Sequence, residues 1–210
     1  MPFGLPGAAS EIAALICLAL LLEAAPQRLY VEAAGVRTRL GWRMVNGLTS
    51  FAAGAVVLVL AGGASGLATA IAVCACATIV FSDVRYFLIP DLCTAAILAA
   101  ALLKLPATGL AAPAVGATLG ALMLLLVIWL GHLRGIEGMG FGDVKLAFAL
   151  GALLGPRTIL WALCGGSLLG LAWALAAFLA RRRFDIVPFG AMLAAAAIAM
   201  LTANVAGASS

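Results

Sequence analysis

Charged residues are scarce in this sequence. Only 10% of the 210 residues are Asp, Glu, Lys or Arg, whereas 66% are hydrophobic, and the mean hydropathy is +1.22. A soluble domain carries about 25% charged and about 45–50% apolar residues. A chain of this length therefore has more apolar surface than one soluble core encloses. The composition excludes an ordinary soluble domain and predicts that lipid is the main solvent.

The residue patterns of metal sites and disulfide frameworks are also missing. The chain has one histidine, His132, and five cysteines, none of which form a CxxC pair. All five cysteines lie in or beside apolar runs, where thiols pack as small hydrophobic side chains. A zinc site of the usual spacing is therefore excluded, and we expect no metal and no other cofactor. The sequence also has no GK[ST] triplet of a phosphate loop, and nothing in it indicates a nucleic-acid partner.

The sequence is instead dominated by apolar runs. Charges, glycines and prolines interrupt these runs and predict an all-α, polytopic membrane helix bundle of about eight transmembrane helices. The predicted crossings are 9–25, 48–62, 66–82, 92–104, 112–131, 143–155, 158–180 and 188–206. Residues 48–82 are interpreted as two helices, because one helix of that length would far exceed the thickness of a membrane.

The basic residues predict the orientation of this bundle. If the N- and C-termini both lie outside, most of the 12 Lys and Arg residues fall in or beside the inside connections, as is typical of the cytoplasmic side. The inside group is Arg28, Arg37, Arg39, Arg43, Arg85, Arg134, Lys145, Arg181, Arg182 and Arg183, and the outside group is Lys104 and Arg157. Residues 1–65 are interpreted as N-terminal hairpins with a basic interfacial loop, 26–47. Residues 66–210 form the candidate catalytic region.

Three of the eight acidic residues stand at predicted inside ends of helices. Asp83 ends the third crossing, Asp143 opens the sixth, and Asp91 follows Pro90 at the start of the fourth. An ionised carboxylate at the edge of the hydrocarbon is costly and often functional. Helix capping is the simpler interpretation of Asp91 and an alternative for Asp143. The alternative for Asp83 is an ion pair with Arg85, although residues two apart on a helix point to different faces.

Asp83 and Asp143 lie at the same predicted membrane depth and suggest a paired-carboxylate site. Two carboxyl groups that share a site do not both ionise easily, so one keeps its proton near neutral pH. The ionised group can accept a proton from an attacking water, and the protonated group can donate to the oxyanion or the leaving amine. The same pair could instead carry protons in a proton-coupled transporter. The spacing of the two acids does not separate these alternatives.

Glycines surround the second of these acids in the stretch GMGFGDVK. Gly138, Gly140 and Gly142 lack side chains, which permits close approach of another extended backbone. We interpret them as room for a substrate chain beside Asp143. Lys145 is interpreted either as support for the charge of Asp143 or for a bound substrate, or as an ordinary basic residue of the inside face.

Three segments, in order, resemble the type IV prepilin peptidase family. GMGFGDVKLAFALGALLG resembles its GxGD segment, FSDVRYFLIPD its first-aspartate segment (D-x-R-x-x-x-I-P-[DN]), and VPFGAMLAAAA its PFG segment at the start of the last helix. The resemblance covers 66–206 well and 1–65 only by hydropathy. It implies a GxGD aspartyl endopeptidase with Asp83 and Asp143 as catalytic residues. The supporting residues that it implies are Gly140, Gly142, Lys145, Asp91, Pro188 and Gly190.

The resemblance also implies what the protein acts on. Members of the family lie in the cytoplasmic (inner) membrane and remove the short basic leader of prepilins or pseudopilins on the cytoplasmic side, just before the hydrophobic segment of the substrate. Long members also N-methylate the new terminus through a domain with paired CxxC motifs, whereas residues 26–47 contain no cysteine. We therefore expect a peptidase-only form whose partners are leader peptides and the lipid bilayer. The sequence does not indicate an oligomeric state.

Overall fold

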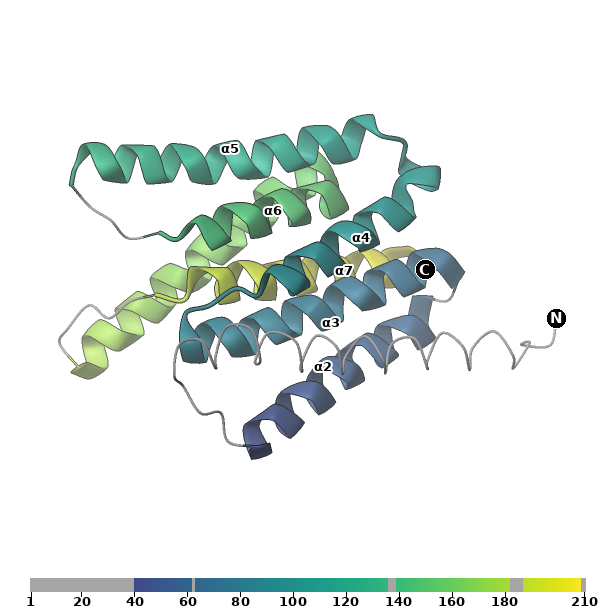
Figure 1. Cartoon of the computed structure of the whole chain (residues 1–210), viewed down its shortest axis with the longest axis horizontal. Coiled ribbons are helices and arrows are strands. Elements are labelled where there is room, and N and C mark those ends of the chain that lie inside the picture. The colour runs from purple at the N-terminus through teal and green to yellow at the C-terminus, as the bar shows by residue number, and fades with distance from the viewer. Residues whose placement is uncertain (1–39, 62, 136–138, 182–186, 209–210) are drawn as a thin grey trace.

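The computed structural model of this protein describes residues 40–61, 63–135, 139–181 and 187–208. Within these ranges every regular element is a helix and no strand occurs. The helices are α2 (Leu40–Ala61), α3 (Gly63–Tyr86), α4 (Asp91–Thr108), α5 (Ala111–Leu133), α6 (Phe141–Arg181) and α7 (Phe189–Ala208). They pack side by side as a bundle (Figure 1). The all-α prediction is confirmed for the described part of the chain.

Several of these helices are long and apolar enough to cross a membrane. By length and composition, the described residues contain four such candidates: Gly66–Tyr86, Asp91–Thr108, Ala111–Leu133 and Phe141–Ala180. Helices α2 and α7 contain shorter apolar stretches, Asn46–Leu58 and Phe189–Asn204. These helices make the chain a multi-pass membrane protein. The number of eight crossings and the outside position of the termini stay predictions, and the first predicted crossing, 9–25, lies outside the described residues.

Helix α6 consists of two helical segments joined at a break. Gly155 has φ 78° and ψ 174°, outside the helical region, and Pro156 follows it. Glycine adopts this positive φ without the strain that a side chain brings, and proline disrupts the helical hydrogen bonds of the turn before it. An unbroken helix of 41 residues would be about 60 Å long, twice the hydrocarbon thickness of a bilayer. The second segment instead turns back along the bundle (Figure 1), which confirms the predicted division between 143–155 and 158–180.

Helix α2 begins earlier than predicted. Its first residue is Leu40, whereas the prediction assigned residues 40–47 to the polar connection 26–47. That boundary is wrong because a helix satisfies its own backbone hydrogen bonds and does not need to end where the apolar run ends. The remainder of the connection, 26–39, lies outside the described residues.

Small residues bring α5 into close contact with the first segment of α6. Gly116 of α5 and Gly151 of α6 face each other, and a methyl group added to either would collide with the backbone of the other. One turn further along α5, a Cβ on Gly120 would lie 2.5 Å from the carbonyl oxygen of Ala147. Small residues spaced four apart allow membrane helices to approach this closely. Helix α5 is therefore anchored to the part of α6 that carries Asp143.

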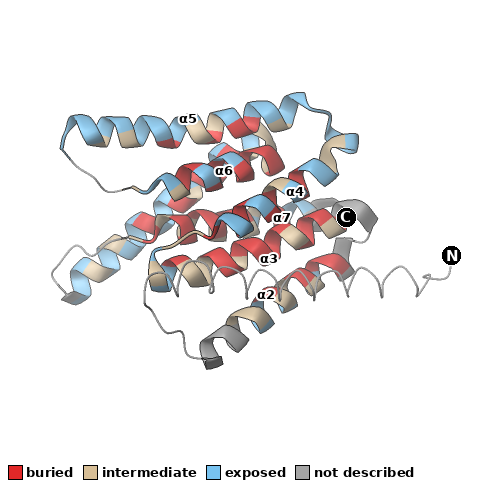
Figure 2. Ribbon diagram, viewed as in Figure 1, coloured by how far each residue is buried: buried red, intermediate tan, exposed pale blue. Residues whose placement is uncertain are grey.

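Helix α3 lies at the centre of the bundle, where it contacts α2, α4 and α7. Its small side chains between Ala68 and Ile79 are largely buried, as Figure 2 shows. Helix α5 and the second segment of α6 instead expose large apolar side chains such as Leu122, Trp161 and Leu171. Lipid is the solvent that suits such surfaces. The well-packed part of the bundle is therefore α3, α7 and the start of α6, and it holds both candidate catalytic acids.

Candidate active site

The two predicted catalytic aspartates meet at one end of the bundle. Asp83 lies in the last turn of α3, and Asp143 lies in the first turn of α6. Asp83 is 5% exposed and Asp143 is 9% exposed. Both carboxylates lie against neighbouring residues of α7, Asp83 at the N–H of Ala191 and Asp143 beside Gly190. The structure therefore brings together, in one buried place, two acids that are far apart in the sequence.

The start of α7 holds the carboxylate of Asp83. The backbone N–H of Ala191 donates a hydrogen bond of 2.7 Å to Oδ2 of Asp83. Helix α7 begins at Phe189, so this N–H belongs to the first turn, whose donors have no partner within the helix. The N-terminal end of a helix also carries a partial positive charge that stabilises a carboxylate. Asp83 of α3 thus caps α7, and α7 in turn fixes the position of Asp83.

The PFG segment lies directly against Asp143 as well. The carbonyl oxygen of Pro188 accepts a hydrogen bond from the N–H of Met192, at 3.3 Å, and this bond starts α7. A Cβ added to Gly190 would come within 3.1 Å of Oδ1 of Asp143 and 2.5 Å of Cδ1 of Ile89. A side chain at position 190 would therefore require Ile89 to shift and would press on the carboxylate of Asp143. Through residues 190 and 191, the first turn of α7 contacts both acids.

Asp143 is also held by the residues that precede it. The backbone N–H of Gly140 donates a hydrogen bond to the carboxylate of Asp143. The N–H of Asp143 in turn donates to the carbonyl oxygen of Gly140, at 3.2 Å. This reciprocal arrangement resembles a capping box, in which an acidic side chain binds a backbone N–H at the helix start. The capping alternative for Asp143 is thus compatible with the paired site, because Oδ1 still faces Gly190.

Ile89 fills the space beside the glycines. A Cβ added to Gly142 would touch the Ile89 side chain at 3.6 Å, and a Cβ on Gly190 would collide with it. The room that Gly142 was predicted to leave for a substrate chain is therefore lined by Ile89 in this structure. Ile89 was not among the predicted site residues, although it lies in the FSDVRYFLIPD segment. Its contact with Gly142 and Gly190 depends on the α3–α4 connection meeting the starts of α6 and α7.

The connection between α3 and α4 positions Ile89. The hydroxyl of Ser82 donates a hydrogen bond of 2.5 Å to the carbonyl oxygen of Leu88. Phe87 adopts a left-handed conformation, with φ 52°, and its N–H donates to the carbonyl oxygen of Asp83 at 2.9 Å. These contacts form a tight turn directly after the first aspartate. They link the backbone of Asp83 to Ile89, whose side chain contacts Gly142 and Gly190.

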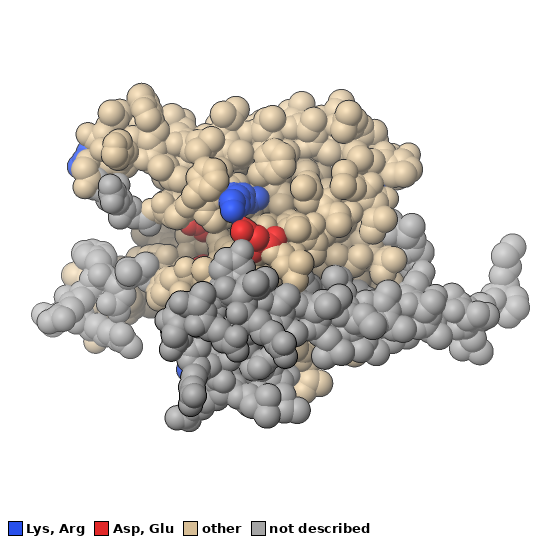
Figure 3. Space-filling view, in the orientation of Figure 1, with Lys and Arg blue, Asp and Glu red and all other residues tan. Residues whose placement is uncertain are grey.

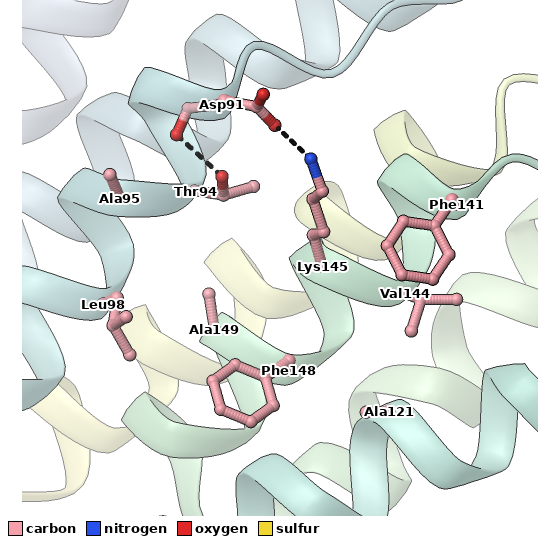
Figure 4. Close-up of a pocket in the computed structure, with 10 residues that line it drawn as sticks. All are labelled: Asp91, Thr94, Ala95, Leu98, Ala121, Phe141, Val144, Lys145, Phe148 and Ala149. Atoms are coloured by element: carbon pink, nitrogen blue, oxygen red, sulfur yellow. Dashed lines mark hydrogen bonds and ion pairs between the residues drawn. The ribbon is translucent and has the colours of Figure 1, made fainter.

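Asp91 and Lys145 form a separate ion pair. Nζ of Lys145 lies 3.0 Å from Oδ1 of Asp91, and the two side chains are 47% and 53% exposed. Asp91 is the first residue of α4, and the N-cap is Pro90, without a side-chain cap hydrogen bond. The prediction that Asp91 is the N-cap is therefore wrong: its carboxylate is directed to Lys145 (Figure 4). Lys145 correspondingly directs its ammonium group to Asp91, and the structure shows no contact by which it supports Asp143.

The chemistry available at this site is that of two carboxyl groups. Within the described residues no group of three or more His, Cys, Asp or Glu side chains could hold a metal ion. Asp83 and Asp143 can accept and donate protons at adjacent positions, as general acid–base catalysis requires. Fold and site together define a polytopic helical membrane protein with a buried aspartate pair.

Comparison with known proteins identifies the family. Residues 70–175 match the type IV leader peptidase family, and the chain belongs to this family. The matched region runs from α3 into the second segment of α6 and contains both Asp83 and Asp143. It ends before Pro188 and Gly190, whose roles rest on the contacts described above.

The chain is also similar to proteins that are named as prepilin leader peptidases. A prepilin leader peptidase/N-methyltransferase of Burkholderia pseudomallei (strain K96243) is 38% identical over 164 residues, which are 73% of this chain and 52% of the relative. The protein of the same name from Aeromonas hydrophila is 35% identical over 159 residues, 73% of this chain and 55% of the relative. One from Xanthomonas campestris pv. campestris is 39% identical over 126 residues, which are 54% of this chain and 42% of the relative. The chain spans about half the length of these relatives. No solved structure matches the chain.

Proposed function

We propose that this protein is a membrane aspartyl endopeptidase that removes the basic leader peptide of prepilins or pseudopilins at the cytoplasmic face of the inner membrane. The observation that carries the proposal is that Asp83 and Asp143 lie together in a buried site formed by α3, α6 and α7. Family membership supports the substrate class, as do the relatives named prepilin leader peptidase.

In the proposed reaction the two acids divide the proton transfers. We assign the resting negative charge to Asp83, because the positive end of α7 donates a hydrogen bond to it. This carboxylate takes a proton from water as the water oxygen attacks the carbonyl carbon of the scissile peptide bond. Asp143, carrying a proton, donates it to the developing oxyanion. The proton that Asp83 accepted then passes to the leaving nitrogen as the C–N bond breaks, and a hydroxyl of the tetrahedral intermediate returns its proton to Asp143 as the carbonyl re-forms.

The end of the bundle that carries these acids supports a cytoplasmic site. The ends of α3 and α5 and the starts of α4, α6 and α7 lie on the same side of the bundle (Figure 1). Arg85, Arg134 and Lys145 lie at these helix ends, whereas Lys104 and Arg157 lie near the opposite helix ends. Basic residues collect on the cytoplasmic side of membrane proteins. A basic leader held in the cytoplasm would therefore reach Asp83 and Asp143.

We further propose that this chain performs cleavage without N-methylation. The names of the relatives include an N-methyltransferase, but this sequence contains no CxxC pair. The product of the reaction would then keep an unmodified N-terminus. Mass spectrometry of the processed pilin distinguishes the two outcomes, since a methyl group adds a fixed mass.

Asparagine variants test the peptidase function. Membranes that contain the protein are incubated with a prepilin, and processing is followed by the change in its size. We expect Asp83→Asn and Asp143→Asn each to lose about 10³-fold or more of the wild-type rate, because each acid has its own proton-transfer role. Thr202→Val, an exposed change on α7, serves as the control with wild-type activity.

Normal processing by either asparagine variant would contradict the assignment. Proton flux into reconstituted vesicles, without cleavage of any prepilin by the wild-type protein, would instead favour the proton-coupled transporter.

A further inference from the structure

A groove of about 410 Å³ opens between α4, α5 and the start of α6. Its floor and walls are apolar and include Leu98, Ala121, Val144 and Phe148 (Figure 4). Ligand sites in proteins are mostly apolar and have volumes of about 300–1,000 Å³. Neither acid of the candidate active site lines this groove. It is therefore a separate surface that the cleavage chemistry does not account for.

The groove nevertheless lies next to the active site. Val144 and Lys145, which line it, directly follow Asp143 in α6. Successive residues of a helix point in directions about 100° apart and rise by only 1.5 Å. A chain segment in the groove would therefore lie on the α4 side of α6, within one turn of the buried carboxylate.

The mouth of the groove carries opposite charges. Figure 4 shows the Asp91 carboxylate and the Lys145 ammonium group facing each other at one end, with Thr94 on the same turn of α4 as Asp91. In the space-filling view, basic and acidic atoms touch on the visible face, with uncharged residues above them (Figure 3). About half of each side chain is exposed, and exposed ion pairs contribute little to stability. A cationic side chain of a ligand can therefore replace Lys145 as the partner of Asp91 at low cost.

We propose that this groove binds the apolar segment of the substrate next to the scissile bond, and that Asp91 binds a basic side chain of the leader. This inference rests on the proposed function and identifies the surface that recognises the substrate. Charge complementarity supports this occupant, because a half-exposed carboxylate at the mouth of an apolar groove matches a basic leader followed by an apolar segment. A lipid chain would also fit the apolar floor, and its headgroup phosphate would find Lys145 at the mouth, so lipid is the alternative occupant that the crosslinking experiment below tests.

Two alanines of α4 provide a matched test of the groove. Ala95 and Ala99 are both exposed and lie one turn apart, but only Ala95 lines the groove. We expect Ala95→Phe to raise KM for a prepilin at least tenfold with little change in kcat, as the loss of ground-state binding does. Ala99→Phe should change KM by less than twofold. Equal KM values for the two variants would overturn the proposal.

Substitutions at the mouth test the role of Asp91. With a basic leader, Asp91→Asn should raise KM about fivefold, whereas Lys145→Gln should lower KM, because it removes the competing cation. With a leader whose basic residues are replaced by glutamine, Asp91→Asn should have no effect on KM. If both variants raise KM equally with either leader, the ion pair has only a structural role and this part of the proposal fails.

Photocrosslinking identifies the occupant directly. A photoreactive side chain replaces Leu98 in the full chain that also carries Asp143→Asn, and the protein is illuminated with prepilin in phospholipid vesicles. A crosslink to the apolar segment of the prepilin supports the proposal, and a lipid adduct alone overturns it. Failure of the wild-type protein to cleave any prepilin would defeat the proposed function itself. Normal cleavage with an unchanged KM for Ala95→Phe would defeat only the groove.

Discussion

Two pairs of charged side chains lie at the same end of this bundle, and their environments are opposite. Asp83 and Asp143 are buried, are both acids and are held by backbone N–H groups of helix starts. Asp91 and Lys145 are half-exposed, carry opposite charges and hold each other. Burial of two acids side by side is costly, so it persists only where the surrounding structure enforces it. The contrast separates a pair suited to chemistry from a pair suited to recognition.

The largest expected effect concerns whether the buried acids act as one unit. Asp83→Asn, Asp143→Asn and the double variant are compared by single-turnover cleavage of a prepilin. Each single variant should lose about 10³-fold or more, and the double variant should lose little beyond that, because residues that act together are not additive. Losses that multiply in the double variant would show that the two acids work independently.

A side chain at position 190 should disturb only the buried pair. Gly190→Val would press on Ile89 and on Oδ1 of Asp143, so we expect kcat to fall by about 10²-fold, as misplacement of a catalytic group does. Gly165→Ala is the control at another contact between α6 and α7, because its Cβ would meet that of Ala196 at an ordinary 3.4 Å. Wild-type activity of Gly190→Val would show that α7 does not position Asp143.

The contact of α5 with α6 should affect both pairs through stability, since α6 carries Asp143 and Lys145. Gly116→Val would place methyl groups against the backbone around Gly151. Overpacking of this kind costs about 1–3 kcal/mol, measured as a loss of unfolding free energy in detergent. Leu122→Ala, at an exposed position of the same helix, should stay within about 0.5 kcal/mol. Equal losses for the two variants would contradict the close approach of α5 and α6.

The smallest effect is expected at the exposed pair. Asp91→Asn and Lys145→Gln should each lower the unfolding free energy by less than about 1 kcal/mol, because solvent screens an exposed ion pair. Thermal unfolding in detergent at two salt concentrations measures this, and added salt should reduce the difference from wild type. A loss of several kcal/mol would mean that this pair, like the buried acids, is part of the packed structure.

Local features of the sequence were sufficient to predict the described helices, apart from the start of α2. Apolar runs, with breaks at glycine and proline, indicate membrane helices because every backbone polar group in lipid needs an internal partner. The break at Gly155 and Pro156 was predictable for the same reason, since both residues interrupt a helix locally. The start of α2 at Leu40 was missed, because the hydropathy of a segment does not show where a helix ends in the polar interface.

The buried acids could also be identified from the sequence, because an aspartate at the edge of an apolar run is costly wherever it lies. Their surroundings could not be. The hydrogen bond from Ala191 to Asp83, the Ile89 side chain beside Gly190, and the groove between α4, α5 and α6 all join segments that are not local in the sequence. The partner of Asp91 was misassigned for this reason: capping is a local rule, whereas Lys145 reaches it from another helix. Composition and local pattern therefore determined the helices and the candidate acids of this protein. Which groups meet was decided by the packing of small residues between helices, because such contacts have no fixed spacing along the chain.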